Sequence, residues 1–366
     1  MDIIPYLKLM ADKNASDLFF CTGTEPQIKI EGVIRAVGSE KMIPGLVKEL
    51  AYKIMSPEQV IVFEETLEMN FAIPLKSVGR FRVNIFLQRG EVSIVIRYIQ
   101  AHIPNFTEMN LPPILGDIIM DKRGLVLVVG ATGSGKSTTL AAMIGHRNRH
   151  SASHILTIED PLEFIHTHEK SIVQQREVGI DTLSYGNALK NALREAPDVI
   201  LIGEIRDMET MKFAISYAET GHLCLATLHA NNANQTLDRI MNFFPEAGHR
   251  QLMMDISLNI RAIISQRLII AKTDKIRVPA VEVMLNTPYI AELIAKGNVG
   301  DIKAVMTDSN EEGMVTFDQS LLKLYREDKI TLEEAISNAD SKNDLSLAIR
   351  MSGDVGDDNT SELILG

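Results

Sequence analysis

The chain has 366 residues, of which 45% are hydrophobic and 23% charged, and its formal net charge is −11. This length is enough for two domains with full cores. No apolar run approaches the ~18 residues that a membrane-spanning helix needs. An acidic chain without tryptophan is also a poor candidate for sequence-independent binding of nucleic acid, and we expect none.

The cysteine content and the N-terminus both bear on the cellular compartment. Cys21 and Cys224 lie in apolar, strand-like runs, which favours buried free thiols over a disulfide. Two cysteines are also too few for a Cys₄ zinc site. The first residues lack a basic region followed by an apolar block, so we expect no secretory signal. These features predict a cytoplasmic protein.

The first hundred residues mix short helical and strand-like patterns. The predicted helices cover residues 2–13, residues 42–55 and a stretch that begins with Ser56 as its cap and Pro57 in its first turn. The predicted strands cover residues 17–21, 27–30, 33–34, 67–73, 81–86 and 92–97. We therefore expect an N-terminal α+β domain over residues 1–100.

A proline-containing segment follows this domain. Residues 101–113 hold three prolines among polar residues, which is typical of a semi-rigid linker. We place the domain boundary there and expect a second domain over residues 114–350, which begins with a helix over residues 114–121. Residues 351–366 are predicted to form an acidic, disordered tail.

Short apolar strands alternate with helices in the second domain. Strand-like runs occur at residues 124–129, 155–158, 199–202 and 223–227, and this rhythm predicts βαβ units around a central, mostly parallel sheet. Beyond residue 245 the pattern predicts a long amphipathic helix over residues 249–264, paired strands over residues 267–271 and 278–283, and a helical C-terminal extension up to residue 350. The fold class is therefore α/β.

The segment Gly-Ala-Thr-Gly-Ser-Gly-Lys-Ser fits the phosphate-binding pattern Gly-x-x-x-x-Gly-Lys-Ser, between a buried strand and a helix. Backbone N–H groups of such a loop and the helix N-terminus attract a polyphosphate. Lys136 is expected to reach the β and γ phosphates, and the Ser137 hydroxyl to bind Mg²⁺. The predicted ATP-binding residues are Gly130, Ala131, Thr132, Gly133, Ser134, Gly135, Lys136, Ser137 and Thr138.

Two carboxylates follow strands that are expected to end near this loop. Glu204 follows the apolar run 199–202, and Glu159 follows the run 155–158. Ligands of open parallel sheets bind at the carboxyl ends of the strands. Glu204 is therefore a candidate to hold Mg²⁺ or to polarise the attacking water, with Glu159 beside it. Sequence alone leaves open which glutamate is the general base and which serves the metal.

Two histidines bracket the run 223–227. A lone histidine is most often a structural residue, but a strand end beside a nucleotide also makes it a candidate sensor of the γ-phosphate. We expect this role for His229 first and for His222 second. Their spacing of seven residues directs the two side chains to opposite faces of a regular strand.

Four arginines, Arg80, Arg82, Arg89 and Arg97, lie in or beside the last two strands before the linker. Such a run is usually a charged sheet face. The alternative is that one or two of them are arginine fingers that reach a nucleotide site.

Several of these segments resemble one family of ATPases. Residues 157–164 resemble its Asp box, residues 198–207 its Walker B segment, residues 221–232 its His box, and residues 15–18 and 79–84 the start and the arginine region of its members. With the phosphate loop, they make the chain similar to the secretion-type hexameric ATPases, and among these to the PilT/PilU retraction ATPases of type IV pili. The resemblance covers about residues 2–350.

The resemblance implies a PAS-like N-terminal domain and a RecA-like P-loop domain. It also implies a homo-hexameric ring in the cytoplasm, bound peripherally at the inner membrane through the pilus platform protein. In the family the nucleotide lies between the two domains and arginines complete the site, which favours Arg80, Arg82 and Arg97 as the arginine candidates. Hydrolysis around the ring would then move the domains as rigid bodies.

One departure from the family pattern concerns residues 287–294. The principal retraction motor carries Ala-Ile-Arg-Asn-Leu here, whereas this chain has Ala291 and Glu292 in place of the Arg-Asn pair. This favours an accessory, PilU-type member that works with a PilT-like retraction ATPase. The alternative is a nucleotide-binding ring adaptor with little hydrolysis of its own. An extension ATPase is disfavoured because its usual tetracysteine zinc insert is missing, and a DNA translocase because the chain is acidic.

Overall fold

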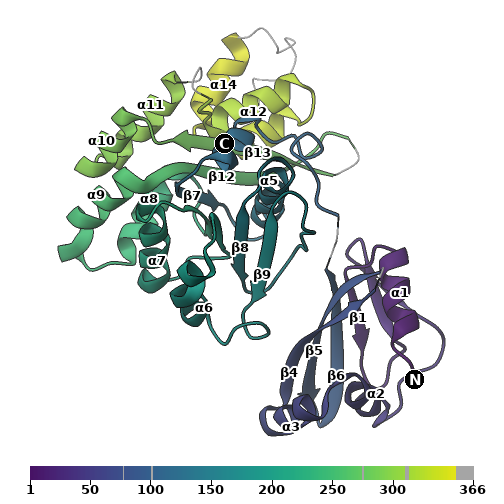
Figure 1. Cartoon of the computed structure of the whole chain (residues 1–366). Helices are drawn as coiled ribbons and strands as arrows, with labels where there is room; N and C mark the ends of the chain where they lie inside the picture. Colours follow the sequence, from purple (N-terminus) through teal and green to yellow (C-terminus); the bar gives the residue numbers. More distant parts are fainter. Residues whose placement is uncertain (77, 100–101, 274–275, 310–312, 352–366) are drawn as a thin grey trace. The chain divides into compact units, whose positions relative to one another are not determined.

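The computed structural model describes residues 1–76, 78–99, 102–273, 276–309 and 313–351, and Figure 1 shows the whole chain. The chain divides into two compact units, each described here by itself. The first comprises Met1–Ile103, Asp160–His166 and Arg176–Ser184, and the second comprises Pro104–Glu159, Thr167–Gln175 and Tyr185 onward. The predicted boundaries at residues 101–113 stay predictions, and Ala101 and residues 352–366 lie outside the described part.

The first unit is built on an antiparallel sheet in the order β3-β2-β1-β6-β5-β4. Its strands are β1 (Asp17–Phe20), β2 (Gln27–Ile30), β3 (Val33–Ala36), β4 (Glu68–Leu75), β5 (Gly79–Gln88) and β6 (Glu91–Ile99), and its helices are α1 (Ile4–Asp12), α2 (Leu46–Ile54) and α3 (Pro57–Thr66). Along β5, buried Phe81, Val83 and Ile85 alternate with more polar residues. This alternation places one face of the sheet on the core and leaves the arginines on the other.

The helix starts of this unit follow local signals. Ser56 accepts a hydrogen bond from the Gln59 amide, and the Gln59 side chain accepts one from the Ser56 amide, so the predicted cap is confirmed as a capping box. The helix predicted from residue 42 begins only at Leu46. Gly45 before it has a φ of 80°, a left-handed conformation that the interior of a helix cannot contain.

The second unit holds the seven-stranded sheet, in the order β13-β12-β7-β11-β10-β8-β9. Its strands are β7 (Gly124–Val129), β8 (His154–Glu159), β9 (Ile172–Glu177), β10 (Val199–Ile202), β11 (Leu223–Leu228), β12 (Ile260–Ile270) and β13 (Arg277–Leu285). The last two residues of β9 are counted with the first unit. The pairs from β12 through β7, β11 and β10 to β8 are parallel, and β12 pairs with β13 antiparallel. Every residue of β7 is buried, which identifies it as a central strand covered on both faces.

Helices surround this sheet, as Figure 1 shows. They are α4 (Ile114–Met120), α5 (Lys136–His150), α6 (Tyr185–Ala192), α7 (Met208–Glu219), α8 (Ala233–Asn242), α9 (His249–Asn259), α10 (Pro288–Lys296), α11 (Ile302–Asp308), α12 (Phe317–Arg326), α13 (Leu332–Ser337) and α14 (Lys342–Met351). Helices α5 and α7 pack on β7, and α8 packs on β12 and β13. Among the described residues, no helix is long and apolar enough to cross a membrane.

One sequence prediction about this unit is wrong. The helix expected over residues 249–264 ends at Asn259, and β12 begins at Ile260. Residues 260–264 include three β-branched isoleucines that fit a pleated strand. In this position they pair with β7 on one side and with β13 on the other, so long-range pairing overrides the helical periodicity.

The C-terminal helices form a small core of their own on the β12–β13 pair. Buried Phe317, Leu321 and Leu345 pack against Ile269 and Ala280 from the strands. Helix α12 begins with a capping box between Thr316 and Gln319. The predicted helical extension is therefore an integral layer on the edge of the second unit.

A buried tyrosine gives a test of packing in this unit. The Tyr217 hydroxyl, on α7, donates a hydrogen bond of 2.6 Å to the Leu189 carbonyl oxygen on α6. Tyr217→Phe should destabilise the unit by about 1–3 kcal/mol because it leaves a buried acceptor unpaired. Thermal unfolding of Tyr217→Phe should show a lower midpoint. The control Tyr289→Phe, at an exposed position, should keep the wild-type midpoint. Equal midpoints for wild type and Tyr217→Phe would contradict the assignment.

Candidate functional site

The predicted phosphate loop joins the end of β7 to the start of α5. The Gly130 backbone has a φ of 152°, and a Cβ atom there would lie 2.4 Å from Ser134 Oγ and 2.5 Å from the Gln266 carbonyl oxygen. Only glycine allows this close approach. Gly135, whose conformation is left-handed, is the N-cap of α5, so the loop leads directly into the helix N-terminus.

The loop and the first turn of α5 contain one cation, Lys136, and several hydroxyl groups. Lys136 is buried, and its Nζ atom donates hydrogen bonds of 2.9 Å to the carbonyl oxygens of Gly130 and Ala131. The buried Ser134 hydroxyl has no hydrogen-bond partner in the described part of the chain. Ser137 and Thr138 are half-buried in the first turn of α5. A helix N-terminus with these donors attracts phosphate oxygens.

Gly130 provides a sharp test of the loop geometry. Gly130→Ala introduces a Cβ into occupied space and backbone strain of about 1–3 kcal/mol. If the loop relieves this strain by moving, nucleotide binding should weaken about tenfold or more. Titration with a fluorescent ADP analogue measures the effect. Gly300→Ala is the matched control, because its added Cβ meets nothing within 4 Å. Equal affinities for Gly130→Ala and wild type would show that the close approach is not needed.

Glu204 and His229 are brought together. Both follow strands of the parallel pair β10 and β11, whose carboxyl ends meet at one edge of the sheet. His229 Nε2 lies 3.1 Å from Glu204 Oε1, and Arg206 Nε donates a hydrogen bond of 2.7 Å to Glu204 Oε2. The Glu204 carboxylate is thus oriented by one contact on each oxygen.

Glu159 lies at the same edge of the sheet, at the end of β8. Its Oε1 atom accepts a hydrogen bond of 2.7 Å from the Thr157 hydroxyl. Gly203 next to Glu204 donates its N–H to the Ile158 carbonyl oxygen at 2.8 Å. A Cβ at Gly203 would lie 3.1 Å from the Glu159 Cα, so the ends of β8 and β10 approach closely.

A cavity of about 320 Å³ joins the loop to the His229 segment. The residues that line it come from the start of the phosphate loop, from the segment after β11 and from α8, namely Gly130, Ala131, His229, Ala230, Asn231, Gln235, Asp238, Arg239 and Asn242. The structure therefore places His229 and the loop on the wall of one cavity.

His222 does not join this group. It precedes β11, and its Nδ1 atom is within hydrogen-bond distance of the Thr220 hydroxyl and the Tyr217 carbonyl oxygen, at 3.1 and 3.2 Å. Because β11 has six residues and runs parallel to β7, His222 lies at the opposite edge of the sheet, roughly 20 Å from the end with Gly130. The expectation that both histidines end near the loop is therefore not met for His222.

The three predicted arginines belong to the first unit, on one face of its sheet. Arg82 is directly opposite Arg97, and Arg97 Nε donates a hydrogen bond of 2.8 Å to Asp17. Arg80 lies 3.8 Å from the buried Glu177 carboxylate. Burial, and next the neighbouring Arg97, lower the pKa of Arg82, and burial raises the pKa of Glu177. Arg97 and Arg80 each lie beside a carboxylate, so this face carries charges of both signs.

The residues of the second unit fit a nucleoside triphosphate and Mg²⁺. The tight Gly130 turn, the buried Ser134 hydroxyl and Lys136 suit phosphate oxygens. Mg²⁺ takes oxygen ligands, usually one or two from the protein, with phosphate and water completing the shell. Ser137 and Glu204 provide such oxygens. Among the residues that the structure describes, no group of three or more His, Cys, Asp or Glu side chains could hold a metal by itself.

Comparison with known proteins shows which family the chain is part of. Residues 3–343 match the model of the type II/IV secretion system protein family. The chain belongs to this family. It is 50% identical over all 366 residues to the type IV pilus ATPase PilU of Pseudomonas aeruginosa, of which it covers 96%. It is also 41% identical over 339 residues to the type IV pilus retraction ATPase PilT of that bacterium, over 93% of the chain and 98% of the relative.

A solved structure supports both the fold and the activity of this secretion-family ATPase. The crystal structure of the pilus retraction motor PilT with bound ADP superposes with a TM-score of 0.88 at 39% identity, covering 95% of this chain and 99% of that one. The predicted fold class, an N-terminal domain followed by a RecA-like core, is confirmed. The chain is an ATPase, and its relatives support a type IV pilus motor.

Two residues near the site, Gln266 and Arg206, were not predicted from the sequence. Gln266 Oε1, on β12, accepts a hydrogen bond of 2.6 Å from the Thr139 hydroxyl, and its Nε2 atom would lie 2.7 Å from a Cβ at Gly135. No local pattern marks Gln266, because its contact spans 127 residues. Arg206 could have been noticed, since it follows Glu204 by two positions.

Proposed function

We propose that this ATPase powers or assists the retraction of type IV pili, and so twitching motility, by Mg²⁺-dependent hydrolysis of ATP. The proposal is supported by identities of 50% and 41% to a pilus ATPase and a pilus retraction ATPase over almost the whole chain. The chain also contains a phosphate loop and two glutamates at strand ends, which are residue types that hydrolysis uses.

The site suggests a role for each residue. Lys136 would hold the β and γ phosphates, and residues 130–138 would cradle the polyphosphate with backbone N–H groups. Ser137 and Glu204 would supply oxygens to Mg²⁺, which would neutralise charge on the phosphates. Glu204 or Glu159 would orient the attacking water, and the choice between them stays open. His229 would respond to the γ-phosphate through its contact with Glu204.

The contact between Glu204 and His229 is the main observation in favour of hydrolysis over nucleotide binding alone. An adaptor that only binds nucleotide needs the phosphate loop, but it does not need a carboxylate oriented on both oxygens beside a histidine. Here the carboxylate receives contacts of 3.1 Å and 2.7 Å from two different side chains. Such preorganisation is typical of groups that act on a bound water or metal.

The proposed assembly is a homo-hexamer in which arginines of the N-terminal units help to complete the nucleotide site. Arg80, Arg82 and Arg97 lie on one face of the sheet, and an arginine finger from this face would stabilise the charge of a nucleotide in the ring. We further propose a cytoplasmic ring bound peripherally at the inner membrane through the pilus platform protein, with a PilT-like retraction ATPase as partner.

One observation favours the second candidate, a ring adaptor with little hydrolysis. Ala291 and Glu292 stand where the principal retraction motor carries Arg-Asn, and Glu292 is exposed on α10, where it pairs with Lys296. The replacement removes a positive charge from the surface of that helix. A member with this surface is expected to depend on its PilT-like partner.

The decisive experiment measures pilus retraction in cells with and without the PilT-like partner, each with and without this chain. An assisting motor should add retraction speed under load only when the partner is present, and an independent motor should retract pili alone. No difference between cells with and without the chain, in either background, would overturn the proposed role in retraction.

A further inference from the structure

Three consecutive residues of β12, Ser265, Gln266 and Arg267, make side-chain contacts on the two faces of the sheet. Gln266 points toward the phosphate loop and bonds Thr139, as described above. Ser265 and Arg267 point to the opposite face, because neighbouring residues of a strand alternate. On that face Ser265 lies beside Glu282 of the neighbouring strand β13, and α8 packs on both strands. The strand β12 therefore contacts the phosphate loop through Gln266 and the C-terminal region through Arg267.

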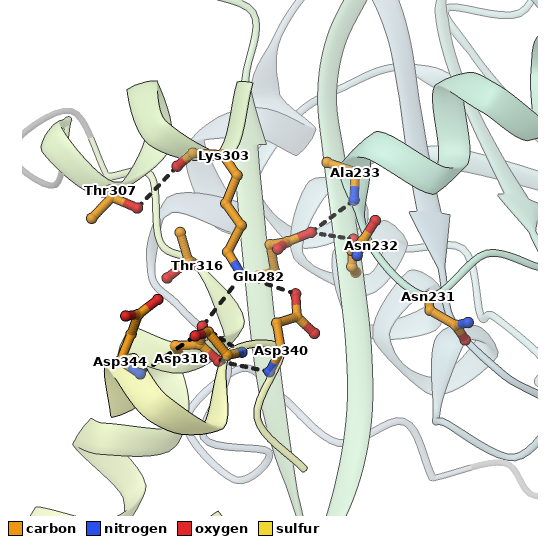
Figure 2. A network of polar contacts seen from close by, with 12 residues as sticks. Asn231, Asn232, Ala233, Glu282, Lys303, Thr307, Thr316, Asp318, Asp340 and Asp344 are labelled. Atoms are coloured by element: carbon orange, nitrogen blue, oxygen red, sulfur yellow. Dashed lines mark hydrogen bonds and ion pairs between the residues drawn. The ribbon is translucent and has the colours of Figure 1, made fainter. Parts of the chain in front are cut away.

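Glu282, on β13, holds the end of the His229 segment. It is 2% exposed, and its Oε1 atom accepts hydrogen bonds of 2.8 Å from the Ala233 N–H and of 2.9 Å from the Ser265 hydroxyl. Ala233 is the first residue of α8, so its N–H is one of the donors that a helix cannot satisfy internally. Figure 2 shows the Glu282 carboxylate facing Ala233.

The buried Glu282 carboxylate restrains residues 229–233, which lead from β11 into α8. Asn232 caps α8 by accepting a hydrogen bond from Gln235, and Glu282 adds a second, long-range cap. Burial raises the pKa of Glu282 to about 7, while the hydrogen bonds from Ala233 and Ser265 and the helix N-terminus favour its ionised form. Ala233 lies four positions after His229, and the Glu282 contact therefore fixes the far end of the segment that carries the histidine.

Arg267 binds the middle of the same segment. Its Nη2 atom lies 3.4 Å from the Asn231 carbonyl oxygen and 2.6 Å from Asp340 Oδ1, and its Nη1 atom donates a hydrogen bond of 2.7 Å to the Asn338 carbonyl oxygen. The guanidinium lies over the Phe317 ring, 3.9 Å from its centroid. A planar guanidinium can make these contacts at once, which an ammonium group cannot.

The C-terminal helices are tied to this arginine through Asp340. Lys303 on α11 lies 3.2 Å from Asp318 and 3.4 Å from Asp340, and the Asp340 N–H donates a hydrogen bond of 2.8 Å to Asp318. Figure 2 shows Lys303 between these two carboxylates. Arg267 is thus shared between the wall of the nucleotide cavity and the layer formed by α11, α12 and α14.

We propose that Glu282 and Arg267 are positioning residues for ATP hydrolysis, which hold residues 229–233 in place and couple them to the C-terminal helices. The inference rests on the proposed function, because it assigns these two residues the task of placing His229 against Glu204. Through Asp340, a movement of the C-terminal helices would shift Asn231 on the cavity wall, and a change at the nucleotide would be transmitted the other way.

The test compares variants of each contact by kcat, by affinity for a fluorescent ADP analogue and by thermal midpoint. Glu282→Ala should lower kcat about tenfold or more, because a small misplacement of a reacting group is costly. Its ADP affinity should stay within about twofold, since the phosphate loop is untouched. Glu282→Gln keeps an accepting oxygen and should restore at least half of the kcat.

Arg267 is tested through its distant partner. Asp340→Asn should lower kcat without changing ADP affinity, and its effect should largely disappear when Arg267→Lys is already present. The matched control is Lys272→Ala, which breaks an ion pair with Asp328 that also involves the C-terminal region but lies away from the His229 segment. The control should keep the wild-type kcat.

The outcomes separate this inference from the proposed function. Folded Glu282→Ala and Asp340→Asn with wild-type kcat would overturn the inference. So would a loss of kcat that follows the thermal midpoint and that Glu282→Gln does not restore, because that indicates general destabilisation. If Lys136→Ala hydrolyses ATP like the wild type, the proposed function fails instead.

Discussion

Lys136→Ala should abolish ATP turnover and with it the contribution of the chain to retraction. The buried Lys136 ammonium group lies at the phosphate loop, 2.9 Å from two backbone carbonyl oxygens of that loop. Removing it takes away the positive charge that would hold the transferred phosphate, and losses of about 10²–10³ in kcat are typical for such a group. Release of phosphate by the purified protein measures the effect, and retraction under load measures its consequence.

Lys122→Ala is the control for that variant. Lys122 is exposed just before β7, outside the phosphate loop, so its removal alters the net charge equally and leaves the loop intact. It should turn over ATP like the wild type. If Lys136→Ala kept wild-type turnover, ATP hydrolysis would have to occur without this loop.

Glu204→Gln should separate nucleotide binding from hydrolysis. The substitution keeps the shape of the side chain but removes the negative charge that faces His229 and Arg206. A group that orients water or transfers a proton typically contributes about 10²–10⁴ to the rate. We therefore expect kcat to fall by about that factor, while ADP still binds at the phosphate loop. Steady-state turnover and equilibrium titration with an ADP analogue measure the two effects separately.

Glu209→Gln serves as the control for the loss of a carboxylate. Glu209 lies in the first turn of α7, which follows the segment that contains Glu204. Its side chain is exposed and lies 4.0 Å from Lys190. Its replacement should leave turnover unchanged. A Glu204→Gln variant with wild-type kcat would exclude Glu204 as base and as metal ligand, and the role would then pass to Glu159.

The parts of the site that were predictable from the sequence are those whose structural context lies within a few residues along the chain. The phosphate loop has its strand and its helix within a few residues on either side, so the motif carries its own structural context. Glu159 and Glu204 were also predictable, because each ends an apolar run and parallel strands end at the same edge. Their roles within the site stay predictions.

The errors come from the direction and pairing of strands. Residues 260–264 have a helical periodicity, but their β-branched side chains pair with β7 and β13 once the sheet exists. His222 was expected near the loop because it flanks the same strand as His229, yet it stands at the opposite end. Which end of a strand faces the nucleotide depends on the whole topology.

The contacts around residues 229–233 were beyond sequence reasoning for a different reason. Glu282 reaches Ala233 across 49 residues, and Arg267 reaches Asp340 across 73. No spacing rule connects such pairs. In the sequence Glu282 looks like one polar residue in an apolar strand, and only its burial and its two donors show what it holds.

The central claim is that residues 130–137, Glu204 and His229 form a working hydrolytic site. Its most direct test is the release of phosphate from ATP by the purified chain alone, with Mg²⁺ and with a chelator, beside Glu204→Gln. The account predicts turnover that requires Mg²⁺ and falls about 10²-fold or more in the variant. Nucleotide binding without turnover above that of Glu204→Gln would contradict it and favour the adaptor.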